Sequence, residues 1–144
     1  MTRTHLAIAF FCAVVVVGLG MAGAETVNAD VATETSAQVE RGRYLVHNAS
    51  MCVQCHSPRD RFGELKTNRL LSGGAVPVKS PFAGPRWAFM APNLRNLPGY
   101  SKEDFLLLME TGRKMDGTMP RLPMPPFRFS TEDAEAIYAY LKTQ

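Results

Sequence analysis

Apolar residues recur at helical spacing near the C-terminus, in two stretches that each begin with the same kind of cap. SKED at 101–104 precedes the apolar run FLLLM, and STED at 130–133 precedes an apolar stripe that continues to about Lys142. A serine followed by acidic residues is typical of a helix N-terminus, because these side chains satisfy or complement its free N–H groups. Gly112 marks the end of the first stretch. We therefore predict one helix behind each cap.

A third amphipathic pattern predicts an earlier helix from Gln38 to about Asn48. The middle of the chain is different: residues 57–100 contain five glycines and six prolines in 44 residues. A loop of that length in a compact domain is usually wrapped around something. No segment shows the sustained alternation of a strand. The pattern predicts an all-α fold of short helices separated by long Gly/Pro-rich loops.

The N-terminus has the pattern of an export signal. Arg3 precedes a continuous apolar run at 6–20, and Ala22-Gly23-Ala24 has the small residues of a cleavage site. The run is shorter than the roughly 20 residues of a membrane-spanning helix. We predict a cleaved signal at 1–24, a flexible tail at 25–37 and a single domain at 38–144, located in the periplasm. An uncleaved membrane anchor is the alternative.

Charge is distributed unevenly along the chain. Residues 25–40 hold four acidic residues and no basic one, whereas residues 41–100 hold nine Lys or Arg against two acidic residues. Such a basic region suits an acidic protein partner or an anionic cofactor, and an ordinary solvated surface has the same composition. The basic residues are scattered among Gly and Pro without a nucleic-acid-binding motif, so nucleic acid is not an expected partner.

The motif CVQCH at 52–56 carries the chemistry. If Cys12 leaves with the signal, Cys52 and Cys55 are the two cysteines that remain. Their spacing lets both thiols form thioethers with one haem while the adjacent His56 binds the iron. A zinc site needs four ligands, and beyond this motif only His47 remains. A thioredoxin-like dithiol needs a βαβ setting, which the pattern lacks. The motif predicts one covalent c-type haem per chain.

With this motif in place, residues 38–144 resemble the class I c-type cytochromes. The stretch APNLRNLPG at 91–99 resembles the GPNL-type loop of that family, and IYAYLK at 137–142 is similar to its C-terminal helix. The resemblance implies a cytochrome c-like fold with short helices and long loops around one covalent haem. It also implies that the chain is an electron-transfer protein rather than an enzyme.

Specific contacts are implied by the same resemblance. The first and last helices would cross with a glycine of the first against an aromatic residue of the last, here Gly42 against Tyr138 or Tyr140. Pro92 would offer its carbonyl to the ring N–H of His56. Such a bond fixes the tautomer of the histidine and raises its basicity as a ligand.

The spacing between His56 and Pro92 is longer than in the smallest members of the family. LLSGGAVPV and PFAGPRWAFMAPNL are similar to haem domains of cytochrome subunits that serve periplasmic dehydrogenases. Those subunits often carry several haems, whereas this chain has one CxxCH motif. The single motif therefore leaves the identity of the redox partner undecided.

Two methionines are candidates for the second axial ligand. A thioether opposite histidine is the usual electron-transfer pairing, because soft sulfur favours Fe(II) and raises the reduction potential. Met119 lies eleven residues before Ser130 and Met124 six, in the sequence MPPF. The family places its ligand methionine in an M-P-P-F-like stretch a few residues before the last helix. We predict Met124 as the ligand and Met119 as a neighbour.

Other polar and aromatic residues have ordinary interpretations beside functional ones. His47 is only nine residues from His56, so we interpret it as a surface histidine rather than a second axial histidine. Four aromatic residues suit either the haem crevice or the core, namely Trp87, Tyr100, Phe127 and Phe129. Three arginines are candidates to pair with haem propionates, namely Arg59, Arg61 and Arg86.

The sequence thus predicts a periplasmic carrier of single electrons. Its haem would be held by Cys52, Cys55, His56 and Met124, and its partners would be a dehydrogenase and a respiratory acceptor such as a terminal oxidase. One alternative is a cytochrome subunit docked permanently on an oxidoreductase. Another is a peroxidase-like or gas-binding protein with an open sixth position at the iron.

Overall fold

The computed structural model describes residues 35–81 and 86–144. The predicted export signal at 1–24 and residues 25–34 of the predicted tail lie outside the described residues. Within the described part of the chain, no helix has the length and apolar character needed to cross a membrane.

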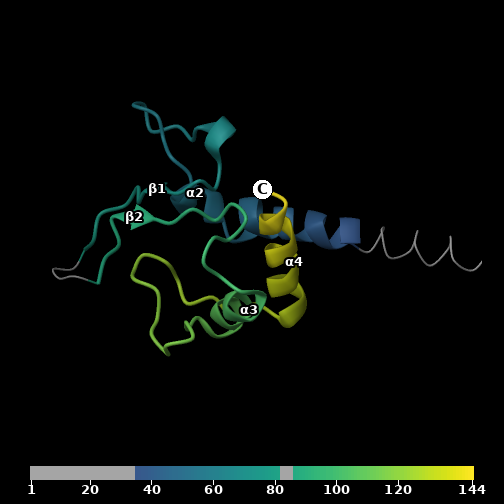
Figure 1. Cartoon of the computed structure of the whole chain (residues 1–144). Coiled ribbons are helices and arrows are strands. Elements are labelled where there is room, and N and C mark those ends of the chain that lie inside the picture. Colours follow the sequence, from purple (N-terminus) through teal and green to yellow (C-terminus); the bar gives the residue numbers. More distant parts are fainter. Residues whose placement is uncertain (1–34, 82–85) are drawn as a thin grey trace, which may run out of the picture.

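Helices form the framework of the domain (Figure 1). The first helix, 35–44, continues directly into the π-helix η1 (Leu45–Ala49). It is followed by α2 (Cys52–His56), the short 3-10 helix η2 (Thr67–Arg69), α3 (Lys102–Thr111) and α4 (Thr131–Lys142). Two strands, β1 (Gly74–Ala75) and β2 (Met90–Ala91), pair antiparallel. The predicted all-α fold is confirmed, with a two-stranded sheet too short to produce an alternating pattern.

The two C-terminal helices begin where their caps predict. The Ser101 hydroxyl accepts a hydrogen bond from the Asp104 N–H at 3.1 Å, and the Ser130 hydroxyl accepts one from the Asp133 N–H at 3.2 Å. Gly112 ends α3 with φ of 64°, a left-handed conformation that glycine adopts without a Cβ penalty. The local signals therefore predicted the N-termini of both helices and the C-terminus of α3 correctly.

The first helix is longer than its apolar pattern indicates. It is already helical at residue 35, three residues before the predicted start at Gln38. At its other end the Ser50 N–H donates to the Leu45 carbonyl at 2.8 Å, which closes the wider π turn. Met51 then adopts φ of 50° and separates this helix from α2.

Helix α4 crosses the first helix at Gly42 (Figure 1). A Cβ added there would overlap the carbonyl oxygen of Ala136 and lie 2.8 Å from the Cβ of Tyr140. Of the two tyrosines left open by the sequence, Tyr140 therefore lies against Gly42. The Tyr138 ring instead packs against Phe105, with centroids 5.8 Å apart.

Apolar side chains from η1, α2, α3, α4 and two loop positions meet in one core. Its buried members are Leu45, Val46, Val53, Leu71, Leu97, Phe105, Leu108, Met109, Ala134, Ile137, Tyr140 and Leu141. Burial of each large side chain contributes about 1.5–3 kcal/mol. Val53 belongs to this set, so the core holds the helix that carries the CVQCH motif.

His47 joins the first and last helices rather than lying free on the surface. Its Nε2 is 2.6 Å from the hydroxyl of Tyr140, and the two rings meet edge to face. The side chain is half-buried. Burial lowers the pKa of His47, and the nearby Arg43 cation lowers it further.

We expect His47 to make the domain less stable in mild acid. Because its folded-state pKa lies below its unfolded value of about 6.5, the unfolded chain takes up the proton more readily. The stability that neutral His47 contributes is complete above its pKa in the unfolded chain. It is lost as the pH falls through its pKa in the folded protein. Urea unfolding at pH 7 and pH 5 should show a smaller loss for His47→Gln than for the wild type. Equal losses would contradict this assignment.

Candidate haem-attachment site

Helix α2 brings the two cysteines and the histidine of CVQCH onto a single short turn of helix. Cys52 and Cys55 are both free thiols and both partly exposed. Burial raises the pKa of the Cys52 thiol to about 11, so it is protonated at neutral pH. Two thiols on one turn, beside a histidine, match the arrangement that the sequence predicts for covalent attachment.

The His56 ring is held by one hydrogen bond and leaves one nitrogen available. Its Nδ1 donates to the Pro92 carbonyl oxygen at 2.9 Å, which assigns the proton to Nδ1. Within the described residues, Nε2 has no hydrogen-bond partner. The side chain is 8% exposed, and this burial lowers the pKa of His56 while the Pro92 carbonyl partly opposes the shift. His56 is therefore a neutral imidazole with one oriented lone pair.

The segment around β1 places Pro92 beside His56. The Gly73 N–H donates to the His56 carbonyl at 2.8 Å, and β1 pairs with β2, which directly precedes Pro92. A Cβ on Gly73 would lie 2.9 Å from the Ala91 carbonyl oxygen, so only glycine lets the two backbones come this close. Sequence reasoning did not single out Gly73, although the Gly-Gly pair at 73–74 was an available signal.

The two candidate methionines have different environments. Met124 is partly buried and packs against the core, whereas Met119 is 50% exposed. The loop that carries them is held at two points: the Ala88 N–H donates to the Leu122 carbonyl between the two methionines at 2.6 Å, and the Phe129 N–H donates to the Met109 carbonyl at 3.1 Å. The choice of Met124 as an axial ligand stays a prediction.

Comparison with known proteins points to one class. No family model matches the chain. A diheme cytochrome c-type protein of Cereibacter sphaeroides is 31% identical over 109 residues, which is 72% of this chain and 34% of that protein. The chain is a distant relative of c-type cytochromes. The cytochrome c subunit of a quinone-type alcohol dehydrogenase of Gluconobacter oxydans is 28% identical over 122 residues, or 74% of this chain and 24% of that subunit.

The chain therefore spans about a third and about a quarter of the length of these two relatives. The mainly helical fold agrees with a cytochrome c domain. The residues of α2 also fit a c-type haem, because they supply two free thiols and a histidine whose Nδ1 is already bonded. Among the described residues, no three His, Cys, Asp or Glu side chains are grouped to hold a metal ion.

Two of the three candidate arginines have identifiable contacts. Arg59 donates to the Gln54 side chain at 2.7 Å and to the Gly63 carbonyl at 2.6 Å, so it ties the following loop to α2. Its Nε is buried and has no hydrogen-bond partner among the residues that the structure describes. Arg61 lies over the Phe62 ring at 4.6 Å. Arg86 is exposed, and its role with a propionate stays a prediction.

The four candidate aromatic residues lie in different parts of the domain. The Trp87 indole donates to the Val78 carbonyl at 3.3 Å, and Tyr100 meets Phe105 edge to face at 6.4 Å. Phe127 and Phe129 stack at 5.1 Å in the loop that follows Met124. The stacked pair therefore stiffens the path between the predicted ligand and α4.

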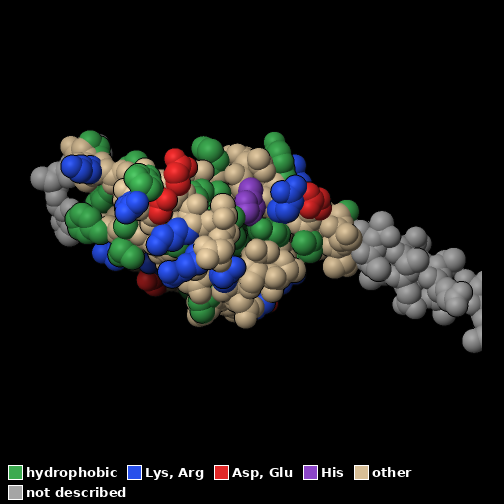
Figure 2. Space-filling view, turned by 90° about the horizontal axis from the view of Figure 1, so that it is seen from above, with side chains coloured by type: hydrophobic (Ala, Val, Ile, Leu, Met, Phe, Trp, Pro, Cys, Tyr) green, Lys and Arg blue, Asp and Glu red, His purple; other side chains and the backbone are tan. Residues whose placement is uncertain are grey.

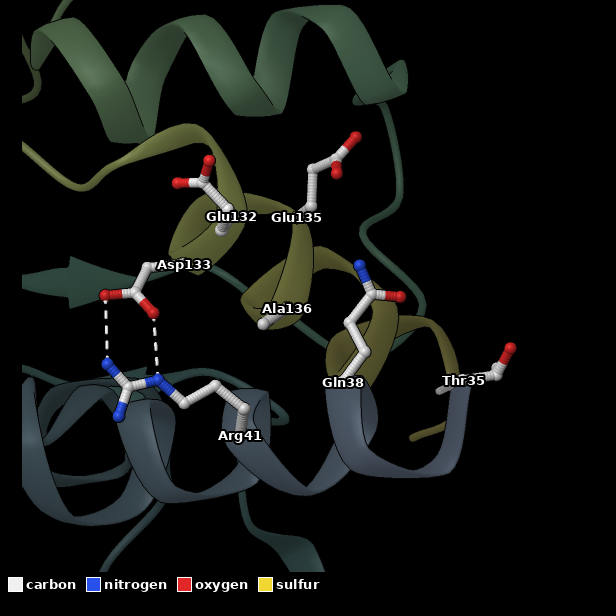
Figure 3. Close-up of a pocket in the computed structure, with 7 residues that line it drawn as sticks. All are labelled: Thr35, Gln38, Arg41, Glu132, Asp133, Glu135 and Ala136. Atoms are coloured by element: carbon white, nitrogen blue, oxygen red, sulfur yellow. Dashed lines mark hydrogen bonds and ion pairs between the residues drawn. The ribbon is translucent and has the colours of Figure 1, made fainter. Parts of the chain in front are cut away.

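A separate hollow lies where the first helix meets α4 (Figure 3). It has a volume of about 500 Å³ and contains no residue of CVQCH or of the methionine loop. Arg41 and Asp133 bridge it at 2.9 Å, and Glu135 pairs with Lys102 at 2.7 Å. Two of its three acidic side chains, Asp133 and Glu135, are ion-paired, and the hollow is a seam between the first helix and α4 that is separate from the CVQCH site.

Proposed function

We propose that this domain carries single electrons with one covalent c-type haem, held through Cys52 and Cys55, with His56 and Met124 as axial ligands. The observation that carries the proposal is the His56 ring, whose Nδ1 is bonded to Pro92 while Nε2 bonds to none of the described residues. When bound, the haem supplies the one-electron exchange of its iron.

The protein's own residues orient and shield that group. The Pro92 carbonyl makes His56 a more basic ligand and holds its ring in one plane. The partly buried position of Met124 supports a fixed thioether opposite the histidine. With both axial positions filled, the chain would exchange electrons without binding a substrate at the iron.

We propose the periplasm as its location, on the basis of the N-terminal pattern, and a dehydrogenase and a respiratory acceptor as partners. The similarity to a cytochrome c subunit of an alcohol dehydrogenase supports the first of these partners.

A permanently docked subunit is the second candidate, favoured by exposed apolar side chains. Phe89 is 80% exposed and Phe62 is 75% exposed. Figure 2 shows hydrophobic side chains interspersed with Lys and Arg over one face. Surfaces of this kind are common at protein contacts, because aromatic residues and arginine contribute strongly there.

Covalent attachment is tested by extraction. After expression with a c-type maturation system, we expect the wild-type haem to remain on the protein in acid-acetone. Cys52→Ser and Cys55→Ser should each leave one bond and shift the absorption of the reduced pyridine adduct, and the double variant should release the haem. Cys12→Ser, which removes the cysteine outside the motif, is the control and should keep it. Full release from the wild type would end the cytochrome proposal.

A further inference from the structure

Ser57 directly follows His56 and has a buried hydroxyl. The side chain is 0% exposed, and its Oγ accepts a hydrogen bond from the Leu71 N–H at 2.9 Å. A buried hydroxyl in an apolar core is costly unless it is bonded in this way. The bond therefore joins the end of α2 to a loop fourteen residues further along the chain.

Leu71 is in turn hydrogen-bonded to the segment that contains Pro92. While its N–H is bonded to Ser57, its carbonyl accepts from the Leu94 N–H at 2.8 Å. Leu94 lies two residues beyond Pro92, whose own carbonyl accepts from His56. The contacts close a ring from His56 through Ser57, Leu71 and Leu94 back to the histidine side chain.

The backbone of Leu71 lies in the left-handed region, which is unfavourable for a leucine. Its φ is +63° and its side chain is 0% exposed, which is unusual for a bulky residue. Such residues persist where their surroundings over-determine them, and they cluster at functional sites. Here the Ser57 hydroxyl and the Leu94 N–H fix the two sides of the same residue.

We propose that Ser57 is a positioning residue for His56, acting through Leu71 to hold the Pro92 carbonyl against Nδ1. The inference rests on the proposed role of His56 as an iron ligand. Loss of the hydroxyl would loosen the Pro92 segment and weaken the Nδ1 hydrogen bond. The imidazole would then be a less basic ligand, would stabilise Fe(III) less, and the reduction potential would rise.

The test compares Ser57→Ala with Ser72→Ala in the holoprotein. Ser72 lies in the same loop, and among the described residues its hydroxyl bonds to the Arg69 carbonyl and not to the Pro92 segment, so it is a matched control. We expect Ser57→Ala to raise the ratio of reduced to oxidised protein at a fixed potential by about two- to tenfold. A tenfold rise corresponds to an increase of about 59 mV in the reduction potential of this one-electron couple. Ser72→Ala should not change it, and Ser57→Thr, which keeps a hydroxyl, should stay near the wild type. Equal potentials in both alanine variants would overturn the proposal.

A measurement on the wild type covers the case in which Ser57→Ala does not fold. In the reduced holoprotein, the Leu71 amide should exchange with deuterium about as slowly as the Leu94 amide, because both belong to one bonded unit. Rapid exchange at Leu71 with slow exchange at Leu94 would show that Ser57 does not hold it. Failure of the carrier function itself is separate, since it would appear first as a wild type without covalent haem.

Discussion

Replacement of Gly42 by alanine is expected to unfold most of the protein or to separate its first and last helices. The added Cβ would overlap the Ala136 carbonyl oxygen and lie 2.6 Å from its carbonyl carbon. Backbone atoms cannot turn aside as a flexible side chain can, so α4 must shift and lose its packing. We expect a loss of about 3 kcal/mol or more in the free energy of unfolding, at the upper end for overpacked sites. Total stabilities are only about 5–15 kcal/mol.

Urea unfolding of the holoprotein measures this loss, with Gly117→Ala as the control. Gly117 has φ of 76°, and among the described residues no atom beyond its chain neighbours lies within 4 Å of an added Cβ, so its substitution costs backbone strain. That strain is worth about 1–2 kcal/mol. A Gly42→Ala variant as stable as the control would mean that the helices do not cross this closely.

The crossing shows which parts of the fold a sequence can predict. Ser101, Gly112 and Ser130 act within one turn of their own helix, so their effect was readable without knowing the neighbours. The partner of Gly42 depended on how α4 is rotated about its axis. An apolar stripe fixes that rotation only to within a residue or two, and Tyr138 and Tyr140 stayed equivalent until the structure distinguished them.

Residues 35–37 of the first helix were missed for a different reason. Residues 35–37 are polar or small and carry no apolar periodicity, so the pattern begins only at the residues that face the core. Helical structure extends beyond that face because, once the helix exists, each further residue adds a hydrogen bond at little entropic cost.

At the candidate site, the sequence predicted CVQCH and Pro92 but not the contacts of Ser57 and Leu71 that lie behind them. CVQCH is local, and the contact between His56 and Pro92 came from resemblance to a family. Ser57 and Leu71 lie fourteen residues apart, and neither type is unusual in a core or a loop. The pair between His47 and Tyr140 spans 93 residues and corrects the interpretation of His47 as a surface residue. Such contacts arise only when distant segments pack.

Loss of the Met124 thioether is expected to have the largest effect on the redox properties. Met124→Ala should remove the iron–thioether charge-transfer band of the oxidised protein. It should also lower the reduction potential by on the order of 0.1 V or more, within the ~0.8 V range that axial ligands set. The reason is that soft sulfur favours Fe(II), and its loss removes that preference. The variant should also bind cyanide or carbon monoxide readily, because one axial position is then open.

Met119→Ala is the matched control, since it removes the same side chain from the same loop. Met119 is 50% exposed, while Met124 packs against the core, so only Met124→Ala should alter the spectrum. If Met119→Ala removes the band and Met124→Ala retains it, the ligand is Met119, and the loop must rearrange to bring that residue inward. If the wild type lacks the band and binds cyanide tightly, the sixth position is open, which favours the peroxidase-like or gas-binding alternative over the electron carrier.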